Sequence, residues 1–138
     1  MMNGVKIDFD ELFNKEMVFK DCELIEYEAG HIRLQTRVNE TDGNPYGIAH
    51  GGYLYTLCDD AAGLLGYSLG YYVVTQQANV NYISSAGVND VLFIEGNCIH
   101  NGRSSKIAEV IVRNEKDRLI CKAGFTLFPL KKVEDEVQ

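Results

Sequence analysis

The sequence has no long apolar segment, since none of its apolar runs approaches the roughly 20 residues that a membrane-spanning helix needs. Its first residues, Met-Met-Asn-Gly-Val-Lys-Ile-Asp, lack the apolar core of a secretory signal peptide. The cysteines form no C-x-x-C pair, which argues against a zinc ribbon or a redox motif. We therefore expect a cytosolic protein with free thiols, three of which lie in apolar patterns and are expected in the core. The four cysteines are Cys22, Cys58, Cys98 and Cys121.

Positive charge is scarce. The formal net charge of -7 argues against a nucleic-acid partner, because phosphate binding favours a basic surface. No Lys or Arg occurs from Val38 to Gly102, and basic residues return from Arg103 onward. If the ligand carries phosphate, its charged end is expected near this later segment, with Arg103 and Lys106 as the candidates. Most of the other basic residues there are interpreted as solvated strand and turn positions.

Two kinds of catalytic site are missing from the sequence. No Gly-x-Ser-x-Gly motif is present, which argues against a serine hydrolase. His31, His50 and His100 lie in separate segments without the paired spacing of metal ligands, so no metal site is predicted. We expect neither a metal ion nor another cofactor.

The chain has 138 residues, 46% of them hydrophobic and 24% charged, and is long enough to fold as one domain around a single core. Residues 1–22 are expected to form an N-terminal helical segment, with its helix at 8–19, and residues 129–138 a frayed acidic tail. Between them, apolar periodicity predicts several strands and one long helix ending near Gly70. The expected strands are 23–27, 31–38, 73–83, 90–99, 106–113 and 119–128.

This order of elements predicts an α+β domain, in which a single antiparallel sheet of about five to six strands wraps against one long helix. A sheet with exposed edges favours pairing with a second copy. Asn101-Gly102 predicts a tight hairpin between two of the strands. In strand 73–83 the alternation puts Thr75 on the face opposite to the apolar one. That apolar face comprises Val74, Ala78, Val80 and Tyr82.

The central feature of the chain is a glycine-rich loop, 39–49, that opens the long helix and is followed by two adjacent acids. At roughly 100° per residue, Asp59 falls on a stripe shared with Gly63 and Gly66, whereas Asp60 falls on the far flank of the helix. The stripe has so little side-chain bulk that a ligand or another backbone can approach it. Asp59 is therefore either a site residue or a solvated helix acid, and the glycines favour the site.

At this point the residues resemble a known family. Asn-x-x-Gly-x-x-His-Gly-Gly, with an Asp nine residues after the His, is similar to the hotdog-fold acyl-CoA thioesterases of the PaaI-like branch. Val-Thr-x-x-x-Asn-x-x-Tyr-Ile at 74–83 and Gly102-Arg103 also resemble that family, and the match spans about residues 32–128. The motif residues are Asn44, Gly47, His50, Gly51, Gly52 and Asp59.

The resemblance implies a role for each residue in thioester hydrolysis. It makes Asp59 the general base or nucleophile, and the Gly51 N–H at the helix N-terminus the donor to the developing oxyanion. Asn44 would bind the thioester or the water. His50 either orients the loop or only packs within it, and Thr75 either holds the attacking water or is an ordinary strand residue. The substrate-binding residues would be Gly52, Arg103 and Lys106, with coenzyme A entering only as part of the substrate.

The resemblance also implies a homodimer as the minimal active unit, usually paired into a homotetramer, with the loop at 44–51 of one subunit facing Asp59 of the other. Two alternatives stay open: a non-catalytic protein that binds acyl-CoA or a fatty acyl group, and a hotdog hydratase or dehydratase. A group of tyrosines around the helix is expected either to line an acyl pocket or to pack at an interface. These are Tyr53, Tyr55, Tyr67, Tyr71 and Tyr72.

Overall fold

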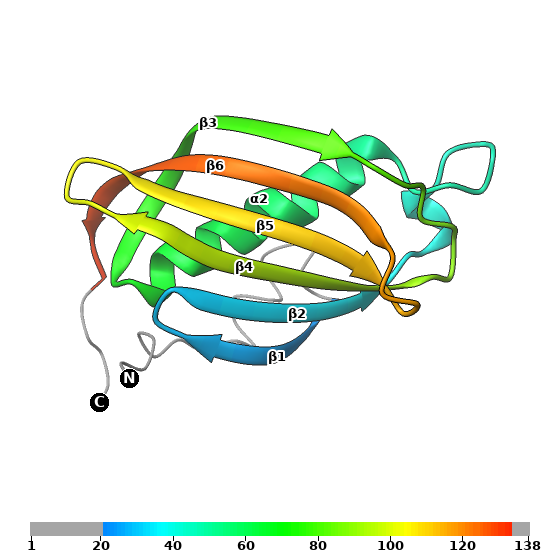
Figure 1. Ribbon diagram of the computed structural model, residues 1–138, viewed down its shortest axis with the longest axis horizontal. Helices are drawn as coiled ribbons and strands as arrows, with labels where there is room; N and C mark the ends of the chain where they lie inside the picture. The colour runs from blue at the N-terminus through cyan, green and yellow to red at the C-terminus, as the bar shows by residue number, and fades with distance from the viewer. Residues whose placement is uncertain (1–20, 134–138) are drawn as a thin grey trace.

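Six strands and one long helix account for most of the part of the chain that the computed structural model describes, residues 21–133 (Figure 1). The expected N-terminal helix at 8–19 lies outside these residues. A short 3-10 helix, η2 (Glu40–Asp42), lies in the loop before the long helix. No helix within residues 21–133 is long and apolar enough to cross a membrane. The elements are β1 (Glu23–Glu28), β2 (His31–Arg37), α2 (Gly51–Ser68), β3 (Tyr71–Tyr82), β4 (Val91–Asn101), β5 (Lys106–Asn114) and β6 (Leu119–Lys132).

The strands form one sheet in the order β1-β2-β4-β5-β6-β3, and every neighbouring pair is antiparallel. Figure 1 shows this sheet curving over α2, which lies along its concave face. The predicted α+β architecture, a single antiparallel sheet wrapped against one helix, is confirmed. Because β3 is an edge strand, one side of its backbone is left unpaired within the described part of the chain.

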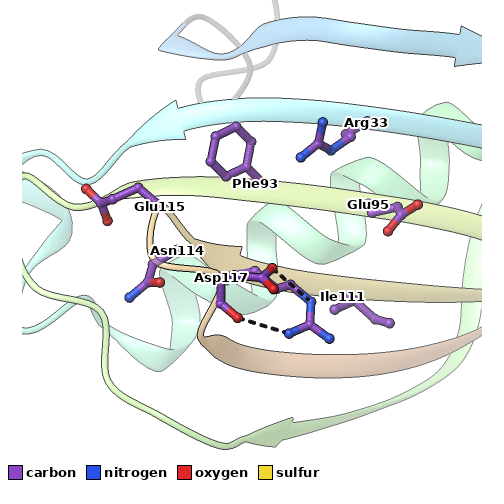
Figure 2. Close-up of a pocket in the computed structure, with 8 residues that line it drawn as sticks. Arg33, Phe93, Glu95, Ile111, Asn114, Glu115 and Asp117 are labelled. Atoms are coloured by element: carbon purple, nitrogen blue, oxygen red, sulfur yellow. Dashed lines mark hydrogen bonds and ion pairs between the residues drawn. The ribbon is translucent and has the colours of Figure 1, made fainter.

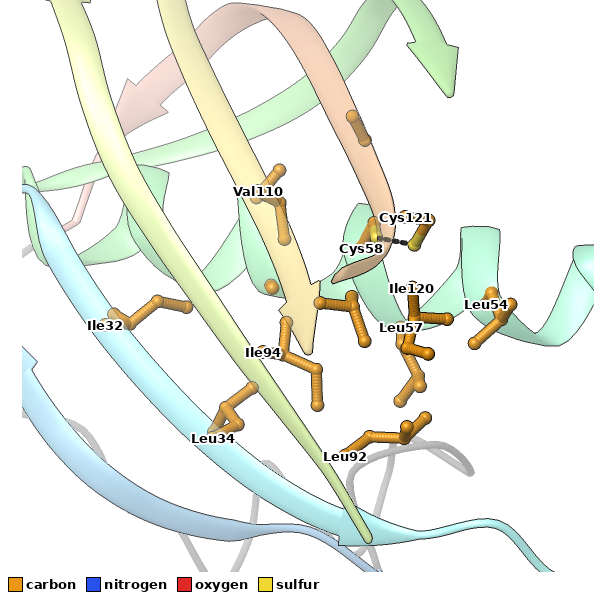
Figure 3. Close-up of a cluster of buried hydrophobic side chains, with 14 of the residues drawn as sticks. Ile32, Leu34, Leu54, Leu57, Cys58, Leu92, Ile94, Val110, Ile120 and Cys121 are labelled. Atoms are coloured by element: carbon orange, nitrogen blue, oxygen red, sulfur yellow. Dashed lines mark hydrogen bonds between the residues drawn. The ribbon is translucent and has the colours of Figure 1, made fainter. Parts of the chain in front are cut away.

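The core lies between the helix and the concave face of the sheet (Figure 3). In β2 the alternation places every second side chain inward, as the sequence predicted, and β5 buries the three residues expected to face the core. The apolar stripe of α2 is also buried as expected. The predicted core residues found buried are Ile32, Leu34, Thr36, Val38, Leu54, Leu57, Cys58, Ala61, Leu65, Ala108, Val110 and Val112.

Two strand ends differ from the sequence prediction. The β4–β5 hairpin is not a two-residue Asn-Gly turn: β4 continues through Asn101, and residues 102–105 form the loop, closed by a 3.0 Å hydrogen bond from the Gly102 N–H to the Ser105 carbonyl. Strand β6 continues past Phe128 to Lys132, because its end pairs with the start of β3. Residues 129–132 are therefore strand rather than frayed tail.

Candidate active site

The loop that precedes α2 is closed by the side chain of Asn44. Its Oδ1 accepts hydrogen bonds from the backbone N–H groups of Tyr46, at 2.9 Å, and Ile48, at 3.2 Å, while its own backbone N–H donates to the Ile48 carbonyl at 2.7 Å. Gly47 has a φ of 76°, a left-handed conformation that glycine adopts without strain. Within the described residues the Asn44 amide nitrogen donates to no protein group. The loop therefore holds this amide as a donor at its surface.

The first turn of α2 presents backbone N–H groups without side-chain cover. His50 is the N-cap, with φ −60° and ψ 141°, and its exposed side chain makes no capping hydrogen bond. The first intrahelical bond runs from Leu54 to the His50 carbonyl at 3.1 Å, so the N–H groups of residues 51–53 have no acceptor within the helix. Together with the positive end of the helix dipole, these groups favour a negatively charged oxygen.

An aromatic ring lies against Gly51 and leaves little room for a side chain there. A Cβ at this position would lie 3.2 Å from Cζ of Tyr82, whose hydroxyl donates a 2.8 Å hydrogen bond to the Gly51 carbonyl. Gly52, by contrast, is open on its Cβ side. Sequence reasoning gave no role to Tyr82, although it had placed this residue on the apolar face of its strand and within the motif at 74–83.

Two turns further along α2, the carboxylate of Asp59 meets the hydroxyl of Thr75 on β3. The Thr75 Oγ1 donates a hydrogen bond to Asp59 Oδ1 at 2.5 Å. A bond of this length between a hydroxyl and a carboxylate belongs to the strong, charge-assisted class. The structure therefore joins two of the predicted catalytic residues, and it joins them from different elements.

A β-bulge explains how Thr75 faces the helix. Thr75 pairs with Leu127 and Gln77 pairs with Thr126, so Gln76 is an extra residue in β3 without a partner on β6. Each extra residue reverses which side chains face inward. The predicted faces of this strand were therefore wrong before the bulge: Val74 is 45% exposed, whereas Thr75 lies on the helix side together with Ala78, which follows the bulge.

A groove of about 480 Å³ begins at this pair and runs between α2 and the start of β3. Three of the five tyrosines expected around the helix line it, whereas Tyr53 and Tyr55 pack against the core instead. Asp60 also lines the groove, but the bond to Thr75 is made by Asp59. The lining residues are Asp59, Asp60, Gly63, Leu64, Tyr67, Tyr71, Tyr72, Val73, Val74 and Thr75.

The glycine stripe beside Asp59 has two different explanations. A Cβ on Gly66 would lie 2.6 Å from a methyl group of Val73, so this glycine allows β3 of the same chain to pack tightly on α2. A Cβ on Gly63 would meet no atom within 4 Å. At Gly66, the space that the sequence left open for a ligand or another backbone is therefore filled by Val73 of the same chain.

The two basic candidates in the β4–β5 hairpin have different environments. Lys106 is only 3% exposed, and its ammonium donates to Asn101 Oδ1 and, at 3.1 Å, to the Gly102 carbonyl. The same ammonium lies 4.4 Å from the ring centroid of Tyr71. This geometry suits a residue that fixes the hairpin and supports the groove wall better than one that binds phosphate. Arg103 is exposed on the hairpin loop.

The thiols of the described residues belong to the packing. Cys22, Cys58 and Cys121 are buried, and Sγ of Cys58 lies 3.8 Å from Sγ of Cys121. Burial raises the pKa of the Cys22 thiol to about 11, so this group stays protonated and unreactive at neutral pH. Nowhere in residues 21–133 do three His, Cys, Asp or Glu side chains gather as metal ligands.

A second hollow, on the outer face of the sheet, offers no comparable chemistry. Figure 2 shows it over β2, β4 and β5, where Arg113 contacts Asp117 through a 3.2 Å hydrogen bond to its carbonyl, and Arg33 lies 4.9 Å over the ring of Phe93. Two arginines stand among three carboxylates there, so the hollow has no net positive charge to hold a phosphate. The lining residues are Arg33, Phe93, Glu95, Ile111, Arg113, Asn114, Glu115 and Asp117.

Comparison with known proteins shows which family this chain belongs to. The model of the thioesterase superfamily matches residues 46–121, more than half of the chain. A hypothetical thioesterase protein from Streptococcus pneumoniae TIGR4, solved with coenzyme A, is 37% identical to this chain. The match covers 92% of this chain and 100% of that protein, with a TM-score of 0.87. The protein smu.793 from Streptococcus mutans UA159, solved with acetyl CoA, is 40% identical over 82% of this chain and 91% of its own, with a TM-score of 0.81.

Two further findings add to this comparison. The pneumococcal protein has also been crystallised as two single-alanine mutants, one of an aspartate and one of a threonine, separated by 16 positions as Asp59 and Thr75 are here. The 1,4-dihydroxy-2-naphthoyl-CoA hydrolase of Listeria monocytogenes is 26% identical over 80% of this chain and 91% of its own length. The chain belongs to the thioesterase superfamily and is a thioester hydrolase with the hotdog fold.

Proposed function

We propose that this protein hydrolyses acyl-CoA thioesters in the manner of the PaaI-like branch, at a site that Asp59 and Thr75 of one subunit form with the loop and first helical turn of a second. The observation that carries the proposal is the 2.5 Å hydrogen bond between Thr75 and Asp59 at the head of a groove. The relatives solved with coenzyme A and acetyl CoA support the choice of thioester.

Asp59 acts on the water or on the acyl group directly. As general base it removes a proton from water while the water oxygen attacks the thioester carbonyl; as nucleophile its own oxygen attacks and water later releases the acid. In both routes the carbon–sulfur bond breaks and coenzyme A leaves as the thiol. The Thr75 hydroxyl fixes the carboxylate orientation through Oδ1, which leaves Oδ2 for the reaction.

The oxyanion that forms during attack is held by the other half of the site. Its donors are the Gly51 N–H, assisted by that of Gly52, and the Asn44 amide, which the loop holds by its Oδ1 and leaves with a free N–H₂ side. His50 serves as the helix N-cap and orients the loop without taking part in proton transfer. Such donors are typically worth about 10²–10³ in rate in acyl-transfer enzymes.

Helix geometry argues that the two halves come from different subunits. Eight residues separate Gly51 from Asp59, and at about 1.5 Å per residue that places them about 12 Å apart along α2, too far to contact one thioester carbon. Strand β3, which carries Thr75, is a sheet edge of 12 residues and offers its free side to a second copy. We infer a homodimer as the active unit, paired into a homotetramer, and an inactive monomer.

Arg103 is the residue we propose for the coenzyme A phosphates. It is exposed on the β4–β5 hairpin, and Lys106 beside it is already engaged within the chain. The proposed reaction uses no metal and no cofactor other than the coenzyme A of its substrate, and we expect it to take place in the cytosol.

Thiol release tests this proposal directly. The purified protein is assayed with short-, medium- and long-chain acyl-CoAs and with aryl acyl-CoAs, using a thiol reagent, while a parallel assay of enoyl-CoA follows double-bond absorbance. We expect free thiol from at least one acyl-CoA and no change in the double bond. Binding of acyl-CoA without any thiol release would favour the non-catalytic alternative, and a change in absorbance without thiol would favour the hydratase.

A mixing experiment tests the shared site. Asp59→Asn and Asn44→Asp are near-isosteric changes, and the second keeps the Oδ1 that holds the loop. Each variant alone should be inactive. After co-expression, mixed dimers contain one intact site, so thioesterase activity should return. If the mixture stays as inactive as its components, both residues act within one subunit and the cross-subunit assignment is wrong.

A further inference from the structure

We propose that Gly63 sets the size of the acyl group that this enzyme accepts in the groove beside Asp59. This inference rests on the proposed hydrolysis at Asp59, and it adds a specificity-determining residue to that site.

The groove continues directly from the reacting carboxylate. Residues four apart on a helix lie on the same face, so Asp59, Gly63 and Tyr67 follow one another along the wall that α2 contributes. Asp59 and Thr75 stand at one end of this wall. An acyl carbonyl held at Asp59 therefore points its chain either along the groove or out into solvent, and the groove offers it apolar cover.

Gly63 is the position where the wall has no side chain. A Cβ built on it would meet no atom within 4 Å, whereas one built on Gly66 would collide with Val73 at 2.6 Å. The two glycines lie three residues apart on the same helix, yet only Gly66 is explained by the packing of this chain. The space over Gly63 belongs to the groove, and a side chain there would occupy the volume next to the carbonyl.

The residues that line the groove disfavour a negatively charged acyl group and favour an aromatic one. Its only ionisable acids or bases besides tyrosine are two aspartates, Asp59 and Asp60, so an acyl group that ends in a carboxylate would be repelled. Lys131 does not line the groove, and its ammonium lies 5.3 Å from the ring centroid of Tyr72. Tyr72 in turn packs edge-to-face on Tyr67 with centroids 5.6 Å apart, a geometry that favours further aromatic contacts.

Gly63→Leu tests the proposal by filling this space with a side chain that helices accept. Thiol release is measured with acetyl-, hexanoyl-, phenylacetyl- and succinyl-CoA for the wild type, for Gly63→Leu, and for the matched control Lys116→Leu, which adds the same side chain at an exposed turn. Binding of S-methyl-CoA and S-hexyl-CoA, thioethers that cannot be hydrolysed, is measured by calorimetry on the same three proteins. The binding arm reports on the groove even if no thioester is turned over.

The wild type should prefer hexanoyl- or phenylacetyl-CoA to succinyl-CoA. Gly63→Leu should lose about tenfold or more in kcat/KM for the larger groups and in affinity for S-hexyl-CoA, but keep acetyl-CoA turnover and S-methyl-CoA affinity, since pocket size discriminates on this scale. Equal losses for small and large groups, or a change in the number of subunits with loss of all activity, would overturn the proposal and make Gly63 a subunit contact. If the wild type turns over no thioester, but Gly63→Leu still binds S-hexyl-CoA more weakly than the wild type does, only the hydrolysis at Asp59 is overturned.

Discussion

The two glycines of α2 that share the Asp59 face should respond in opposite directions to the same substitution. In Gly66→Ala the new Cβ would lie 2.6 and 2.8 Å from the two methyl carbons of Val73 and 3.2 Å from its Cβ. No rotation of a β-branched side chain clears all three contacts, because χ1 of Val is stiff and its Cβ is fixed by the backbone. Normal carbon–carbon contact begins near 3.5 Å, so β3 must move away from α2 by about 1 Å.

That movement has a cost in stability and a consequence at the site. Overpacking of this kind costs about 1–3 kcal/mol, against a gain of about 1 kcal/mol for Ala over Gly in a helix, so the free energy of unfolding should fall by up to about 2 kcal/mol. Thr75 lies two residues from Val73, and a shift of about 1 Å would lengthen its 2.5 Å bond to Asp59 to the limit of a hydrogen bond. Gly66→Ala should therefore also slow hydrolysis.

Gly63→Ala is the matched comparison, because its Cβ meets no neighbour. It should raise the free energy of unfolding by about 0.5–1 kcal/mol. Urea denaturation at one fixed protein concentration measures both variants, and Gly66→Ala combined with Val73→Ala should recover much of the lost stability. Shifts of the same sign in both glycine variants, or no recovery in the double mutant, would refute this account of how β3 is held on the helix.

Three further predictions concern other parts of the structure. Thr75→Ala should lower kcat by about 10²-fold or less while Thr75→Ser keeps most of it, as measured by thiol release, because only the hydroxyl bonds the carboxylate. Lys106→Met should lower the thermal midpoint and leave the KM for acyl-CoA nearly unchanged, since its ammonium is bonded within the hairpin. A hydrogen bond to Glu26 raises the pKa of His31 above its usual value of 6.5. The protonated His31 therefore stabilises the folded state fully below pH 6.5, and this contribution is lost as the pH rises through the raised pKa. In the wild type the urea midpoint should thus fall as the pH rises from below 6.5 through the raised pKa, and it should change less in His31→Gln.

Much of the fold could be predicted because its signals are local. Alternation in β2 and β5 follows from burial of one face, and the three- to four-residue period of α2 follows from its contact with the sheet. The phase of the same helix also distinguished Asp59 from Asp60, and Asp59 is the one that bonds Thr75. These properties depend on near neighbours in the sequence.

The parts that sequence reasoning missed depend on partners far along the chain. The bulge at Gln76 arises because β3 has one residue more than β6 between two neighbouring pairs of the ladder. Nothing in the sequence Val-Thr-Gln-Gln-Ala indicates which glutamine is the extra one. Lys106 was expected at a phosphate, but Tyr71, distant in sequence, covers its ammonium. Likewise, the bare face at Gly66 is explained only when Val73 is seen to fill it.

The most direct test of the central claim is the kcat/KM of Asp59→Asn with the best acyl-CoA of the wild type. Asparagine keeps the Oδ1 that accepts the Thr75 hydrogen bond but removes the basic oxygen, so coenzyme A binding and the urea midpoint should stay close to those of the wild type. We expect kcat/KM to fall by at least about 10²-fold. A folded Asp59→Asn protein that releases thiol at the wild-type rate would contradict the assignment of this carboxylate as the catalytic group.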